Sequence, residues 1–251
     1  MTTVLFHISD VHFGAEDRDA LAIVEKAIAQ ERPDALVCTG DVTQRASRRQ
    51  YRDAAQWFGA LGVPVWLDPG NHDMPYGNLA ERFTDPYRRF EELREAVAVA
   101  HFETQDVVLV PLKTTVRAQA RWPWSDGHVT RSAQAKAIDL LARYEGDARH
   151  VIVTAHHPLH GPEPGGPSST VQGNNALALL AQKGMDAILS GHVHRAFDEH
   201  RRGADWEARV IGAGTLSTRV RHGEPAGFNV IRCTLGEPLE VERRRFAAMS
   251  A

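Results

Sequence analysis

The first 70 residues alternate short apolar runs with longer amphipathic segments, and this alternation is the feature that most limits what the chain can fold into. Apolar runs at 4–8, 35–38 and 63–67 end at polar, Gly or Pro residues and predict strands. Between them, residues 19–30 and a segment capped by Ser47 carry apolar side chains at helical spacing. This order predicts parallel strands with right-handed crossovers. Ligands of such sheets bind beyond the carboxyl ends of the strands.

The rest of the chain predicts further elements around two irregular loops. We expect helices at 79–99, 132–144 and 176–182, strands at 151–155 and 187–190, and a hairpin-like pair of strands at 102–112. Residues 117–127 place two tryptophans around a proline, and 161–169 are rich in Gly, Pro and Ser, so both are expected to be loops. Short β-like runs separated by glycines fill 196–245. We see no linker or internal repeat, and therefore expect a single domain over residues 1–251.

Composition excludes several classes of protein. Hydrophobic residues make up 43% and charged residues 24%, which is typical of a soluble globular chain with a sizeable core. The net charge of -3 gives no overall positive field, so a nucleic-acid polymer or an anionic membrane is a disfavoured partner. Cys38 and Cys233 form no disulfide framework, and the N-terminus has no signal-peptide pattern. We therefore expect a cytoplasmic protein.

Polar side chains cluster directly after the predicted strands. They are Asp10 and His12, Asp41, Asn71 to Asp73, His156 and His157, and His192 and His194. Because the carboxyl ends of parallel strands meet at one edge, these groups are expected to face one crevice. Residues two apart in an extended chain point the same way, so Asp10 with His12 is expected to supply two ligands to neighbouring ions. The same holds for His192 with His194.

The types of ligand narrow the identity of the ions. Imidazoles, carboxylates and one amide oxygen, without a thiolate, suit Mn, Fe or Zn better than Ca or Mg. The candidate ligands are Asp10, His12, Asp41, Asn71, His156, His192 and His194. One catalytic zinc typically takes three protein ligands, so this set predicts two divalent ions, with Asp41 as the bridging carboxylate. Gly40, Gly70 and Gly191 precede ligands, as tight turns near an ion require.

Each motif taken alone also has an ordinary explanation. Asp-x-His and Gly-Asp sequences occur in many surface turns, and His156 to Pro158 also fits a packed strand end. The dense clusters Gly70 to Asp73 and Gly191 to His194 are different, because such groups are costly to bury and rarely serve packing. Six of the 13 histidines lie in these motifs, each after a predicted strand. The conjunction therefore predicts a metal site.

In this order the motifs resemble those of the calcineurin-like metallophosphoesterase superfamily, from Asp10 to His194. Ser9 to His12, Gly40 to Thr43 and Ala155 to Pro158 are similar to a small bacterial branch that includes cyclic-nucleotide phosphodiesterases and glycerophosphodiesterases. The resemblance implies an α/β fold, a four-layer α/β-β-α sandwich with the metal site at the C-terminal ends of the strands. It also implies that the Gly-rich tail completes a second sheet.

The resemblance further implies a role for each residue. One ion would be held by Asp10, His12, Asp41 and His194, and the other by Asp41, Asn71, His156 and His192. His72 is left free of metal and is expected to contact the phosphoryl oxygen or protonate the leaving oxygen, with Asp73 orienting its imidazole. A hydroxide bridging the two ions is expected to attack phosphorus in line. His157 is expected to pack beside the metal ligands or, as the less favoured alternative, to contact the substrate.

Substrate contacts are expected from loops above the strand ends. The candidates are Arg45, facing the phosphate or a helix surface, and Arg121, Trp122, Trp124 and His128, on a loop that either stacks a base or covers the flank of the domain. We expect residues 161–169 to form either a lid over the site or only a connecting loop. The favoured reaction is hydrolysis of a small phosphodiester, such as a cyclic nucleotide or a glycerophosphodiester. A phosphomonoesterase or a nuclease on the same site, and a non-catalytic scaffold, are the alternatives. The oligomeric state is left open.

Overall fold

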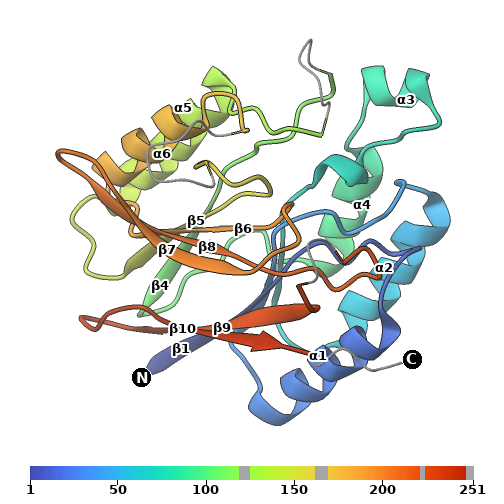
Figure 1. The fold of residues 1–251 in the computed structure, drawn as a ribbon, viewed down its shortest axis with the longest axis horizontal. Coiled ribbons are helices and arrows are strands. Elements are labelled where there is room, and N and C mark those ends of the chain that lie inside the picture. The colour runs from blue at the N-terminus through green and yellow to red at the C-terminus, as the bar shows by residue number, and fades with distance from the viewer. Residues whose placement is uncertain (119–124, 162–168, 221–223, 247–251) are drawn as a thin grey trace.

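Two five-stranded sheets pack face to face, with helices on the outer face of each (Figure 1). The computed structural model describes residues 1–118, 125–161, 169–220 and 224–246. The layers therefore follow the order helix, sheet, sheet, helix, and the predicted α/β-β-α sandwich is confirmed.

The first sheet has the strand order β10-β9-β1-β2-β3. Its strands, with the helices between them, are β1 (Thr2–Ile8), α1 (Arg18–Glu31), β2 (Ala35–Cys38), α2 (Arg48–Ala60), β3 (Val65–Leu67), β9 (Gly227–Thr234) and β10 (Glu240–Arg245). β1, β2 and β3 are parallel, which confirms the predicted β-α-β-α-β unit. α2 begins at the expected cap, where Ser47 and Gln50 form a reciprocal capping box.

The second sheet has the strand order β4-β5-β6-β8-β7. Its elements are β4 (Val107–Pro111), α5 (Arg131–Leu141), the 3-10 turn η2 (Ala142–Tyr144), β5 (His150–Thr154), α6 (Gly173–Gln182), β6 (Ala187–Ser190), β7 (Phe197–Arg202) and β8 (Glu207–Gly212). Only β7 and β8 of the Gly-rich tail join this sheet. β9 instead pairs antiparallel with β1, and β10 with β9, so the tail completes both sheets. The reason is that the first five residues of β9 are all buried, which requires a central strand.

Two predicted elements differ from the structure. The helix expected at 79–99 is split into α3 (Leu79–Thr84) and α4 (Arg88–Val97). Pro86 explains the break, because proline disfavours helical backbone in the residue before it, and Asp85 leaves the helix with φ -144°. In the hairpin expected at 102–112 only the second arm is a strand; it pairs parallel with β5, and a single bridge from Glu103 to Val108 joins the first arm.

Apolar layers separate the four layers of secondary structure. The layer between the sheets draws on both of them and includes Leu5, Val37, Trp66, Leu109, Ile152, Leu189, Ile211 and Ile231. β5 shows the alternation that makes this possible: Ile152 lies in the layer between the sheets, whereas Val151 and Val153 pack with residues of α5 and α6. Among the helices of the described segments, none is long and apolar enough to cross a bilayer.

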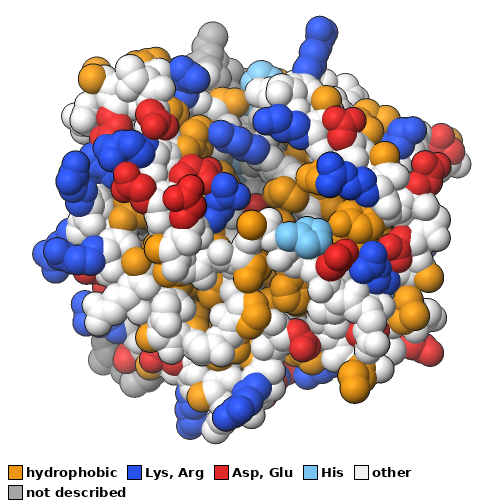
Figure 2. All heavy atoms as spheres, turned by 180° about the vertical axis from the view of Figure 1, so that it is seen from behind, with side chains coloured by type: hydrophobic (Ala, Val, Ile, Leu, Met, Phe, Trp, Pro, Cys, Tyr) orange, Lys and Arg blue, Asp and Glu red, His pale blue; other side chains and the backbone are white. Residues whose placement is uncertain are grey.

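On the face shown in Figure 2, basic and acidic side chains are interleaved. Arg88 pairs with Glu81 at 2.7 Å and with Glu92 at 3.0 Å, and Arg244 pairs with Glu242 at 2.8 Å. Both arginines are therefore balanced by acidic neighbours.

Candidate metal centre

All seven predicted ligands lie where the carboxyl ends of the two sheets meet, a region that we call the rim. Loops after β1, β2 and β3 bring Asp10, His12, Asp41 and Asn71, and loops after β5 and β6 bring His156, His192 and His194. Asn71 begins the 3-10 helix η1 (Asn71–Asp73). Six of the seven are buried, and His192 is partly exposed. Each sheet therefore supplies one wall of the same site.

The backbone at the rim is left-handed rather than extended. Positive φ angles occur at Asp10 (54°), His12 (52°), Asp41 (50°), His192 (69°) and His194 (57°). The extended backbone expected for Asp10 with His12, and for His192 with His194, is therefore wrong, although Asp10 and His12 do project together, with Oδ1 3.7 Å from Nε2. The physical reason is that these residues bond to the neighbouring loop, where the N–H groups of Asp10 and His12 donate to the carbonyls of Gly40 and Asp41 at 3.0 Å. Unusual backbone of this kind concentrates at functional sites.

Two glycines allow the loops to approach one another. A Cβ atom at Gly70 would lie 2.1 Å from the Oδ1 atom of Asp41, and one at Gly191 would lie 1.7 Å from the Oγ atom of Ser9. Neither contact is tolerable, so a larger residue at either position would displace a candidate ligand or its neighbour.

The tautomers of four histidines at the rim are fixed by backbone carbonyls. The Nδ1 atoms of His72, His156 and His194 lie 2.8 Å from the carbonyl oxygens of Gln44, Thr39 and Arg219, and that of His12 lies 3.4 Å from the carbonyl of Thr43. A carbonyl oxygen only accepts, so in the neutral ring Nδ1 carries the hydrogen and Nε2 presents a lone pair. Such contacts commonly orient metal-binding histidines.

The first group of facing donors consists of Asp10, His12 and His194. The Nε2 atom of His194 lies 3.1 Å from Oδ1 of Asp10 and 3.3 Å from Nε2 of His12. These atoms face one another with lone pairs, which is unfavourable unless a cation lies between them. Donors bound about 2.1 Å from one ion stand roughly 3–3.5 Å apart, so the spacing fits a metal.

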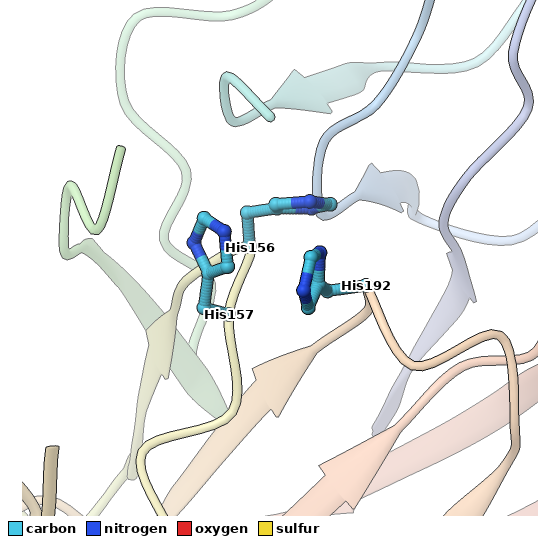
Figure 3. Close-up of side chains that lie close together, drawn as sticks. All are labelled: His156, His157 and His192. Atoms are coloured by element: carbon cyan, nitrogen blue, oxygen red, sulfur yellow. The ribbon is translucent and has the colours of Figure 1, made fainter. Parts of the chain in front are cut away.

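The second group is built around His156. Its Nε2 atom lies 3.1 Å from Oδ1 of Asn71 and 3.4 Å from Oδ2 of Asp41. Figure 3 shows His192 approaching from the end of β6, with its ring centroid 5.2 Å from that of His156. The Oδ2 atom of Asp41 also lies 3.7 Å from Nε2 of His12. Asp41 therefore stands between the two groups, where the sequence predicts a bridging carboxylate.

Electrostatics favour ionised carboxylates at the rim. Burial alone would raise the pKa of Asp41, but the charge and hydrogen bond of His156 outweigh it and hold this pKa well below its usual range. In the same way His194 lowers the pKa of Asp10 against the effect of burial. Burial lowers the pKa of His156, but Asp41 raises it more strongly, to about 9. Metal binding at His156 is therefore expected to release a proton.

Asp73 does not orient His72 as expected. The Nδ1 atom of His72 faces the carbonyl of Gln44, as described above. Asp73 instead accepts hydrogen bonds from the N–H groups of Val42, Thr43 and Gly70 and from the hydroxyl of Thr43, at 2.8–3.1 Å. Burial and the charge of Asp41 raise the pKa of Asp73 to about 7. Asp73 therefore ties the loop after β2 to η1, and positions the backbone around Asp41.

His157 lies beside the ligands with both ring nitrogens engaged. Its Nε2 atom lies 2.8 Å from the carbonyl of Ser125, and its Nδ1 atom lies 2.9 Å from the hydroxyl of Thr114. Burial, together with the charges of His192 and His156, lowers its pKa well below the usual range. A neutral ring held at both nitrogens is suited to packing against His156 and His192 (Figure 3).

The other predicted substrate contacts stay predictions. Arg45 is exposed, and its backbone N–H donates to the Gln50 side chain. Arg121, Trp122 and Trp124 lie outside the described residues, as does most of the loop at 161–169. His128 is partly exposed, and its backbone N–H donates to the carbonyl of Thr114.

Sequence reasoning missed one cation at the site. The Nη1 atom of Arg219 lies 3.3 Å from Nε2 of His72. Arg219 belongs to the Gly-rich tail and to none of the motifs, and the contact joins residues 147 positions apart. No local sequence signal points to it.

Comparison with known proteins agrees with this geometry. Residues 3–196 match the family model of the calcineurin-like phosphoesterases. The chain is 36% identical over 205 residues to the glycerophosphodiester phosphodiesterase GpdQ of Enterobacter lignolyticus, covering 76% of this chain and 70% of that protein. It is 27% identical over 222 residues to the 3′,5′-cyclic adenosine monophosphate phosphodiesterase CpdA of Pseudomonas aeruginosa, covering 80% and 72%. In fold it resembles a dimetal phosphatase from Danio rerio, with a TM-score of 0.67 at 14% identity over 97% and 96% of the two chains.

Proposed function

The chain belongs to the calcineurin-like phosphoesterase family, whose members are metal-dependent phosphoric ester hydrolases, and we propose that it hydrolyses a small phosphodiester with two divalent ions bound at the rim. The observation that carries this proposal is the set of buried Nε2 and carboxylate atoms that face one another at 3.1–3.7 Å around Asp41.

The chain's residues divide between the two ions. One ion would be held by Asp10, His12, Asp41 and His194, and the other by Asp41, Asn71, His156 and His192. This donor set suits Mn or Fe, and also Zn. When bound, the ions would supply an activated water and would stabilise charge on the phosphoryl oxygens.

His72 is proposed to transfer the proton. Its Nδ1–H is held by the Gln44 carbonyl, so Nε2 is the ring nitrogen left to exchange a proton. This end of the ring lies beside Arg219 and near His12, whose ring centroid is 4.8 Å away. With a second proton at Nε2, the ring would donate to the leaving oxygen of the ester. Asp73 would act one step away, by holding the backbone on which His72 and Asp41 sit.

The names of the relatives support a diester as substrate. The two relatives described above are named for a glycerophosphodiester and for a cyclic nucleotide, so they share the diester but differ in the alcohol. The net charge of -3, and the interleaved charges on the face shown in Figure 2, do not favour a polymer.

A substrate panel tests the proposal. Metal-free protein would be reconstituted with Mn, Fe or Zn and assayed with a bis-aryl phosphodiester, an aryl monoester, a cyclic nucleotide, a glycerophosphodiester and single-stranded DNA. We expect the small diesters to be hydrolysed fastest, with activity lost on chelation. His72→Ala should keep its metal content and lose about 10²- to 10⁴-fold in kcat. Absence of turnover with every metal would refute the proposal, and a near wild-type rate for His72→Ala would refute the role of His72.

A further inference from the structure

The guanidinium of Arg219 lies at the rim against uncharged acceptors. Its Nη1 atom is 3.3 Å from Nε2 of His72, 3.5 Å from Nε2 of His12 and 3.3 Å from Oε1 of Gln44. The side chain is partly buried. It thus reaches both the proposed proton donor and a candidate metal ligand.

The loop that carries Arg219 is held firmly against the loop after β1. The hydroxyl of Thr215 donates to the carbonyl of Asp10 at 2.8 Å, and the N–H of Thr218 donates to the carbonyl of Ala15 at 2.9 Å. The carbonyl of Arg219 itself accepts from Nδ1 of His194 at 2.8 Å. The backbone that orients a candidate ligand therefore also sets the position of the guanidinium.

The charge of Arg219 is unbalanced at this position. A guanidinium is always protonated and has five donors but no acceptor. Within the part of the chain that the structure describes, no carboxylate oxygen lies within ion-pair distance of it. A cation that faces only lone pairs, next to a site proposed to hold two metal ions, would be stabilised by an anion between them.

We propose that Arg219 binds a non-bridging oxygen of the phosphoryl group on the side of His72. This inference rests on the proposed function. The planar fork of arginine matches the oxygens of a phosphate, and charge on these oxygens grows in the transition state. The ligand class is a tetrahedral phosphoryl anion, either the diester or inorganic phosphate. Arg45, the phosphate contact that the sequence suggested, lies exposed, whereas Arg219 is partly buried beside His72.

Two substitutions and one control test this assignment. Arg219→Gln removes the charge and keeps the backbone carbonyl that contacts His194, whereas Arg219→Lys keeps the charge and loses the fork. Arg18→Gln is the control, because the Arg18 side chain is 87% exposed and pairs with Glu16. The readouts are bound metal after desalting, inhibition of diester hydrolysis by inorganic phosphate, and kcat and KM measured separately.

We expect Arg219→Gln to keep its metals, to lose about 10²-fold in kcat and to bind inorganic phosphate at least about tenfold more weakly. Arg219→Lys should be intermediate, and Arg18→Gln should match the wild type. Unchanged phosphate inhibition in Arg219→Gln would overturn the inference while leaving the proposed function intact. Loss of metal in both Arg219 variants would also overturn it, because the side chain would then act on the ligands. If the wild type hydrolysed no phosphoester with any metal, the proposed function and this inference would both be wrong.

Discussion

The two sheets meet in an apolar layer along their length and in the polar rim at their carboxyl ends. Leu5 and Ile152 in the layer are fully buried, and Asp41 and His156 at the rim are at most 2% exposed. Burial stabilises the layer, since each side chain removes apolar surface from water. At the rim burial is unfavourable in free energy, because the donor atoms there lose their contacts with water and face one another. The layer therefore supplies the stability that holds a rim suited to cations.

This comparison predicts that the two regions respond differently to substitution. Changes to the metal ligands at the rim should remove metal and activity while the fold persists. Changes in the layer should lower the free energy of unfolding while the ligands keep their positions.

The largest effect is expected from Asp41→Ala at the rim. Asp41 lies within reach of both donor groups, 3.7 Å from Nε2 of His12 and 3.4 Å from Nε2 of His156, so its loss should release both ions. We expect turnover to fall on the order of 10⁴-fold or more, since water activation and charge stabilisation are lost together. Elemental analysis after desalting measures the metal. Full occupancy of both sites in this variant would rule out the bridging role.

A smaller effect, of a different kind, is expected from Ile152→Ala in the layer. Removing a buried isoleucine should lower the free energy of unfolding by about 2–5 kcal/mol, whereas Ile152→Val should lower it by about 0.5–1.5 kcal/mol. Both variants should bind the same amount of metal as the wild type. Urea unfolding of the metal-free and metal-bound forms measures the stabilities. Loss of metal from Ile152→Val without loss of stability would show that the two regions are not separate.

The sequence predicted the rim better than it predicted the connections around it. Asp10, Asp41 and His156 could be predicted because each follows an apolar strand, and the position of a strand end is a local property of the sequence. The left-handed backbone at Asp10 could not be predicted, because it depends on a hydrogen bond to the carbonyl of Gly40 in the next loop. The position of the Arg219 side chain likewise depends on tertiary contacts of its loop, so it could not be predicted from the sequence.

Two other differences have local signals in the sequence. Pro86 interrupts the helical pattern at 79–99 and marks the boundary between α3 and α4. The run Gly227 to Ile231 is apolar except for Asn229, which is typical of a strand buried on both faces, as β9 is. By contrast, the four hydrogen bonds of Asp73 to backbone and hydroxyl groups could be known only from the folded loops.

The boundary between the two regions offers the finest test, and its effect depends on pH. His7, in β1, is fully buried, with Nε2 3.1 Å from the hydroxyl of Thr39 and Nδ1 3.2 Å from Nδ2 of Asn229. Burial lowers its pKa from 6.5 to about 3, against the opposing charge of Asp10. Between these two values the unfolded chain binds a proton that the folded chain does not. Stability contributed by neutral His7 is therefore complete above pH 6.5 and is lost as the pH falls toward 3.

His7→Gln should remove this dependence. Metal-free wild type and variant would be unfolded in urea at pH 7 and pH 5, so that acid release of metal contributes to neither. From pH 7 to pH 5 we expect the free energy of unfolding of the wild type to fall by about 2 kcal/mol more than that of the variant. The slope of this difference is at most ~1.4 kcal/mol per pH unit. A difference in the free energy of unfolding that is the same at both pH values would reflect packing alone. The test is therefore how this difference changes with pH. Parallel profiles would mean that His7 titrates normally in the folded state, and that the polar character of the rim extends deeper between the sheets than the buried position of His7 indicates.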